Sequence, residues 1–202
     1  MNPAGLRERR RRAVRDGLVS AALDLFRRKG FEATTVDEIA DAAGVSRRSF
    51  FRYFPTKEAV AFPHEAQRLA LFRRLLDRSE PGETPWGRVR RGLVALAADY
   101  MRDRDRILEQ ERIVGASPAL AAKETRLDAR WEEEIALALA GRRRGGPPLR
   151  ARMAGAAVVG VVRAAVREWC ARGGRPDLAR LGLAGLDLIE PALRRKTWKG
   201  PL

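Results

Sequence analysis

Residues 46–53 combine three arginines with serine, phenylalanine and tyrosine side chains. Arginine is the side chain best suited to paired hydrogen bonds with guanine O6 and N7, and it also binds phosphates. In a helix, Phe50 and Phe54 would share one face and anchor the segment to a neighbouring helix. The N-terminal turn and one side would then be free to enter a major groove. The polar residues available there are Ser46, Arg47, Arg48, Ser49, Arg52 and Tyr53.

Two short helices must position this segment. Thr35 and Glu38 fit a capping box, in which a hydroxyl and a carboxylate satisfy reciprocal backbone donors. The helix that begins there ends at Gly44, and Ser46 caps the next helix almost at once. Two helices joined by so short a turn indicate a helix-turn-helix over about residues 35–54.

Helical periodicity also extends through the rest of the chain, where strand signals are scarce. The first helix is predicted from Leu6 to Lys29, with Gly30 ending it and Phe31 packing back on it. Pro63 is expected to interrupt the fourth helix, either with a kink or with a restart in which Pro63 is the first residue of a new helix. Later helices are predicted near Pro85–Asp103, Arg104–Val114, Pro118–Ala140, Leu149–Arg172 and Pro176–Arg195. The predicted fold class is therefore all-α.

Composition excludes several classes of site. The single cysteine allows no intramolecular disulfide, and the single histidine allows no histidine cluster or Ser-His-Asp triad within one chain. No metal site or cofactor is expected. The longest apolar stretch, Met153 to Val162, is too short to span a bilayer, and no apolar segment follows the basic N-terminus as in a secretory signal. We expect a soluble, cytoplasmic protein, nucleoid-associated when bound to DNA, with no membrane partner.

The net charge favours a polyanionic partner. Lys and Arg number 41 against 26 Asp and Glu, for a formal charge of +15. An arginine-rich composition with ordinary surface ion pairs is an alternative explanation. Residues 1–60 contain 13 Lys and Arg and 8 Asp and Glu, a net of +5, which leaves +10 downstream. Because the excess is not concentrated near the helix-turn-helix, it is not itself evidence of specific DNA binding.

Residues 34–60 read TTVDEIADAAGVSRRSFFRYFPTKEAV and follow a helix that ends in LFRRKGFEATTV. This text resembles the tetracycline-repressor (TetR) family of bacterial transcription regulators almost throughout. The resemblance implies a three-helix DNA-binding domain over residues 1–60, joined to a helical ligand-binding and dimerisation domain over residues 61–202. It also implies that the chain is a homodimeric repressor of a palindromic operator, released by a small hydrophobic or acyl-CoA-type effector.

The resemblance assigns individual DNA contacts. Thr35 and Lys57 match positions that hold phosphates, with a helix cap and a solvated lysine as the alternatives. Arg47 and Arg48 are the base-reading candidates, each with a phosphate contact as the alternative. Phe51 stands where the family commonly has a tyrosine whose hydroxyl reaches a phosphate, so we expect it to contact a thymine methyl or a sugar instead.

The C-terminal part is less informative. The string around Arg112–Leu120 resembles a subgroup associated with the mycofactocin-system regulator and acyl-CoA-type effectors. Candidate pocket residues, each with plain core or an ion pair as the alternative, are Tyr100, Met101, Trp131, Met153, Arg163, Arg167 and Trp169. The last two predicted helices are either internal core or half of a dimer bundle. The predicted dimer contacts are Gly160, Leu178, Leu181, Leu186 and Ile189.

Two other functions compete with a specific regulator. A non-specific nucleoid-type or RNA-binding protein would use the basic charge without a defined reading helix, which the helix-turn-helix argues against. A small helical enzyme would need paired carboxylates, a metal cluster or a nucleophile with its base, and the sequence shows none.

Overall fold

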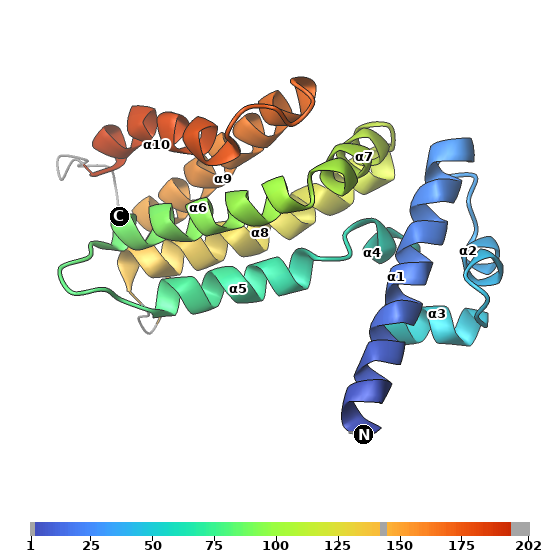
Figure 1. Cartoon of the computed structure of the whole chain (residues 1–202). Coiled ribbons are helices and arrows are strands. Elements are labelled where there is room, and N and C mark those ends of the chain that lie inside the picture. Colours follow the sequence, from blue (N-terminus) through green and yellow to red (C-terminus); the bar gives the residue numbers. More distant parts are fainter. Residues whose placement is uncertain (1–2, 142–144, 195–202) are drawn as a thin grey trace. The chain divides into compact units, whose positions relative to one another are not determined.

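The computed structural model describes residues 3–141 and 145–194, which form ten α-helices and no strand (Figure 1). The all-α prediction is confirmed. In chain order the helices are α1 Pro3–Lys29, α2 Val36–Ala42, α3 Arg47–Tyr53, α4 Lys57–Ala61, α5 Glu65–Asp77, α6 Pro85–Arg102, α7 Arg104–Gly115, α8 Pro118–Ala140, α9 Leu149–Ala171 and α10 Leu178–Arg194. Arg195, the expected end of the last helix, lies outside the described residues.

Local capping chemistry sets the first boundaries. The Thr35 hydroxyl accepts the Glu38 N–H at 3.2 Å, and the Glu38 carboxylate accepts the Thr35 N–H at 2.8 Å, which completes the capping box. The Ser46 hydroxyl caps α3 by accepting the Ser49 N–H at 3.2 Å. Gly30 ends α1 at φ +85°, a backbone conformation that favours glycine. Phe31 then packs edge-on against Phe26, with ring centroids 5.1 Å apart, as predicted.

The break after α4 differs from the prediction in one detail. α4 ends at Ala61, and α5 begins at Glu65 rather than at Pro63. Phe62, which precedes the proline, has φ −120° and ψ 57°, outside the helical region. A residue before proline is sterically pushed out of the α conformation, so the interruption falls at Phe62. The Pro63 carbonyl accepts a hydrogen bond from Arg15 of α1, which holds this turn.

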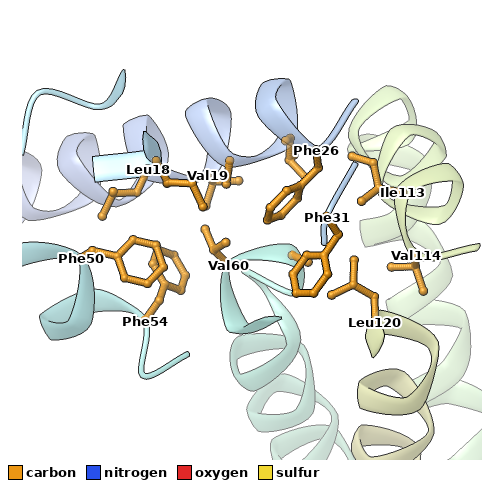
Figure 2. Close-up of a cluster of buried hydrophobic side chains, with 14 of the residues drawn as sticks. Leu18, Val19, Phe26, Phe31, Phe50, Phe54, Val60, Ile113, Val114 and Leu120 are labelled. Carbon is orange, nitrogen blue, oxygen red and sulfur yellow. The ribbon is translucent and has the colours of Figure 1, made fainter. Parts of the chain in front are cut away.

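The chain divides into two compact units. The first holds the residues up to Glu65 together with Glu109–Glu124, and the second holds Ala66–Leu108 and the residues from Thr125 onward. The expected boundary at residue 60 left the end of α7 and the start of α8 in the second domain. They group with the first because Ile113, Val114 and Leu120 are buried in its core beside Phe31 (Figure 2). The Ser117 hydroxyl also donates a 2.6 Å hydrogen bond to Glu32.

The second unit is a helical bundle with two apolar clusters. One surrounds Phe72 and Leu186, and the other surrounds Trp169, whose indole N–H donates to the Pro176 carbonyl at 2.9 Å. Helix α9 approaches α8 closely at Gly155, where an added methyl group would overlap the Glu132 carbonyl oxygen. The small residues predicted to allow close helix contact therefore do so inside one unit.

One buried charge joins α5 to α6. Arg68 is almost fully buried, and its Nε–H donates to the Asp99 carboxylate at 2.8 Å. The Tyr100 ring lies beneath its guanidinium at 4.4 Å, and the Asp103 carboxylate lies 3.6 Å from it. A buried arginine needs such partners, because an uncompensated charge in the interior is costly.

Candidate DNA-binding interface

Helix α3 is held by its phenylalanines. Phe50 and Phe54 are buried in the first unit's core, close to Leu18 and Val19 of α1 (Figure 2). The predicted anchoring face is therefore confirmed. The opposite side of α3 is exposed and carries Arg47, Arg48, Phe51 and Arg52.

The three arginines of α3 have different surroundings. The Arg47 guanidinium binds the Asp37 carboxylate of α2 at 2.6 Å and lies 5.5 Å from the centre of the Phe51 ring. Arg52 lies over the ring of its neighbour Tyr53 at 5.3 Å. Within the described residues Arg48 has no hydrogen-bond, ion-pair or ring partner. Its guanidinium is thus free to bind a nucleic acid without breaking a contact.

Phe51 forms part of the exposed surface. Its side chain is 42% exposed, and its ring stands edge-on against Phe50, with centroids 5.4 Å apart. An apolar ring at this place cannot donate a hydrogen bond to a phosphate. It can contact a thymine methyl or a sugar, as the sequence predicts.

Lys57 and Thr35 have partners in the protein itself. The Lys57 ammonium donates to the carbonyls of Phe31 and Thr34, both at 2.8 Å, and lies 4.1 Å from the Phe31 ring centre. It therefore ties α4 to the loop between α1 and α2. Thr35 is the exposed cap of α2. Their phosphate contacts remain predictions.

The basic end of α1 is ion-paired to α2. The Lys29 ammonium lies 2.5 Å from the Glu38 carboxylate. Together with the Thr35 N–H, this contact lowers the pKa of Glu38 to about 2. Glu38 is thus occupied by Lys29 and the cap, and Asp37 is the acid of α2 that binds α3.

Comparison with known proteins decides the family. Residues 18–62 match the model described as "Bacterial regulatory proteins, tetR family", and residues 83–194 match the "MftR C-terminal domain". The HTH-type transcriptional regulator TcmR of Streptomyces glaucescens is 34% identical over 216 residues, covering 99% of this chain and 92% of TcmR. The chain belongs to the TetR family.

Two further relatives support this assignment. The putative mycofactocin biosynthesis regulator MftR of Mycobacterium tuberculosis is 33% identical over 138 residues, or 68% of this chain and 69% of MftR. Thermus thermophilus FadR, a TetR family repressor solved with lauroyl-CoA, is 28% identical with a TM-score of 0.61, covering 93% of this chain and 99% of FadR. This TetR family chain is a DNA-binding transcriptional regulator of the MftR-like subgroup, as the sequence indicates.

The predicted pocket residues do not gather in one place. Tyr100, Met101 and Trp169 belong to one apolar cluster, whereas Trp131 packs with Phe72 in the other. The remaining three lie outside both clusters. Met153 is 52% exposed, Arg167 is exposed, and Arg163 binds Asp128 at 2.8 Å, the ion pair that was the alternative for it.

The predicted dimer contacts also separate. Leu178 and Leu186 are buried within the protomer, Leu181 and Ile189 are partly buried, and Gly160 is exposed. Sequence reasoning missed Leu188, which at 82% is the most exposed large apolar side chain among the described residues. On α9 an exposed row at helical spacing consists of Leu149, Met153, Ala156, Gly160 and Ala164. Apolar residues occur on both the buried and the exposed sides of α9 and α10, so residue spacing alone does not separate core from surface.

The described part of the chain has neither a metal-binding cluster nor a membrane-spanning helix. No group of three or more histidine, cysteine, aspartate or glutamate side chains there could hold a metal ion. No helix there has the length and apolar character needed to cross a bilayer.

Proposed function

We propose that this chain is a homodimeric repressor whose two α3 helices read a palindromic operator and whose second unit binds an acyl-CoA-type effector that releases DNA. The observation that carries the effector is the likeness to FadR with lauroyl-CoA, which spans nearly the whole of both chains. Residues 83–194 match the MftR C-terminal domain, so the similarity to known regulators is not limited to the helix-turn-helix.

The homodimer is supported by the exposed apolar row of α9 and by Leu188 of α10. We call these residues, with Ala184, the α9–α10 face. Helices α9 and α10 pack together, and the residues of this face are exposed in a single protomer. A second copy related by two-fold symmetry would cover it, and the two reading helices of such a dimer would bind half-sites about 34–36 Å apart on DNA.

Repression and release follow from linkage. A ligand that lowers the protein's operator affinity tenfold must itself bind the protein–DNA complex tenfold more weakly than it binds the free protein. This corresponds to a coupling free energy of about 1.4 kcal/mol. The site of action is the cytoplasm, in association with the nucleoid, and the ligand needs no chemical change to act.

The first experiment selects bound duplexes from a random pool with the wild-type protein. A palindromic consensus supports the operator, and its absence would favour the non-specific nucleic-acid binder.

The second experiment measures operator binding by gel shift against acyl-CoAs of increasing chain length, with free CoA as the control. Release by long-chain acyl-CoA but not by CoA supports the effector class, and no release by any acyl-CoA contradicts it.

A further inference from the structure

The contact between Asp37 and Arg47 joins the two helices of the helix-turn-helix. The residues are ten apart in sequence, and Nη1 of Arg47 donates to the Asp37 carboxylate at 2.6 Å. Both side chains are largely exposed, at 60% for Arg47 and 59% for Asp37. The pair therefore lies on the surface, next to the exposed side of α3.

A second contact restrains the same guanidinium. The Phe51 ring lies one helical turn along α3, 5.5 Å from the Arg47 guanidinium carbon. That ring is itself fixed edge-on against buried Phe50. Arg47 is thus held by a carboxylate and by a ring attached to the core, whereas adjacent Arg48 has no partner among the described residues.

We infer that Asp37 is a specificity-determining residue, which positions Arg47 for a base and opposes its use on phosphates. Asp37 binds Nη1 of Arg47, and the Nε and Nη2 donors of Arg47 have no partner within the described residues. Those two donors form one edge of the guanidinium. One edge is what paired hydrogen bonding to guanine O6 and N7 requires.

The same carboxylate penalises a phosphate contact. A phosphate bound by Arg47 would lie close to Asp37, and two anions in contact repel. A guanine edge carries no net charge, so the ion pair can persist while the base is read. The Asp37 carboxylate therefore lowers affinity for DNA in general more than it lowers affinity for the operator. The ratio of operator affinity to general DNA affinity rises as a result.

Asp41 provides a matched control. It lies on the same helix, is exposed, and has no partner for its carboxylate among the described residues. D37N and D41N therefore make the same change of charge on α2, and only D37N removes the charge that is paired with Arg47. D37E keeps the charge and moves the carboxylate, so it separates charge from position.

The experiment measures binding of wild type, D37N, D41N and D37E to two duplexes across a range of salt. One duplex is the sequence that wild type selects from a random pool, and the other is a scrambled duplex of equal length and composition. For D37N we expect the ratio of affinity for the selected duplex to affinity for the scrambled duplex to fall about 5- to 10-fold. This is part of the base discrimination that a paired guanine contact supplies. On scrambled DNA its salt dependence should steepen by about one unit, as Arg47 gains a phosphate. D41N should leave the ratio within about twofold of wild type, and D37E should lie between D37N and wild type.

Arg47 must carry the effect. In an R47A background, D37N should change the ratio no more than D41N does. Equal effects of D37N and D41N in the wild-type background, or an undiminished effect of D37N in R47A, would overturn the inference. Melting temperatures check that each variant is folded. If wild type selects no consensus, the result contradicts the proposed operator and not the role of Asp37. That role is still tested by comparing how steeply binding of D37N and of D41N to scrambled DNA depends on salt.

Discussion

Neighbouring basic side chains of the reading surface, which is the exposed side of α3 together with Lys57, differ in the contacts they already make within the protein. Arg48 is unpartnered among the described residues, Arg47 is held by Asp37 and Phe51, and Lys57 is committed to two carbonyls. The sequence predicted DNA contacts for all three, with base reading by the two arginines and a phosphate contact by Lys57. The contacts separate a free arginine, a restrained arginine and a lysine that holds the loop before α2, so their substitutions should have different consequences.

Replacing Lys57 with methionine should reduce stability as well as DNA affinity. The methionine keeps the apolar stem and removes the ammonium that bonds to Phe31 and Thr34. Hydrogen bonds to charged groups contribute about 1.5–3 kcal/mol, so we expect the free energy of unfolding to fall by about 2 kcal/mol. R48M is the control, with stability within about 0.5 kcal/mol of wild type and a loss of base preference of about 1–3 kcal/mol. Urea denaturation and binding to the selected duplex measure the two effects, and an unchanged stability of K57M would contradict the role assigned to Lys57.

The capping glutamate predicts a pH dependence. Contact with Lys29 and the Thr35 N–H lowers the pKa of Glu38 from 4.5 to about 2. Because the folded pKa lies below the unfolded one, the ionised side chain stabilises the fold above about pH 4.5. This stabilisation is lost as the pH falls towards 2. Glu38→Gln keeps a capping acceptor and removes the charge, so its melting temperature should decline less steeply with acid than that of wild type. D41N serves as the charge-matched control and should follow wild type; parallel curves for E38Q and wild type would contradict this cause.

At the scale of elements, local signals predicted most helix boundaries. The capping box at Thr35, the Ser46 cap and Gly30 act within a few residues, so their chemistry is visible in sequence. Packing partners could not be predicted in the same way. The apolar faces of α7 and α8 carry no mark that their junction belongs beside Phe31, because burial depends on contacts distant in sequence.

The interface residues show the same limitation. Leu186 and Leu188 are both leucines of α10, yet one is fully buried and the other is 82% exposed. Helical periodicity gives their relative directions but not which direction faces the bundle. The Asp37–Arg47 pair was missed because it depends on the angle between two helices, which the spacing of residues does not specify.

The close approach of α9 to α8 makes Gly155 sensitive to a single methyl group. An alanine there would overlap the backbone carbonyl of Glu132, which cannot move away as a flexible side chain can. We expect G155A to lower the free energy of unfolding by about 1–3 kcal/mol. Gly182 of α10 has nothing within 4 Å of an added methyl group, so G182A should be neutral or stabilising by up to about 1 kcal/mol. Chemical denaturation compares the two, and equal stabilities would contradict the close approach of α9 to α8 at Gly155.

Across the whole molecule, the net charge of +15 is spread over both units rather than gathered at α3. Many arginines of the second unit are committed to carboxylates, among them Arg90 with Asp187 at 2.6 Å and Arg91 with Glu83 at 2.8 Å. Ordinary ion pairing therefore accounts for part of the arginine content. The remaining charge raises affinity for any polyanion, so selectivity must come from the reading surface and from pairing two such surfaces on one operator.

That pairing is the prediction for the whole molecule. Leu188 and Met153 are exposed on the proposed α9–α10 face, so a charge at either would be buried against the second copy. We expect L188E and M153E to be folded monomers that lose tight operator binding, because one half-site contact then has to act alone. Val94 of α6 is 39% exposed and lies outside that face, so V94E should remain a dimer with normal binding. Light scattering at micromolar concentration gives the mass of each variant, and circular dichroism confirms its helicity. A monomeric wild type would contradict the proposed homodimer, whereas a dimeric L188E with wild-type operator affinity would require the two reading helices to be paired through a different surface.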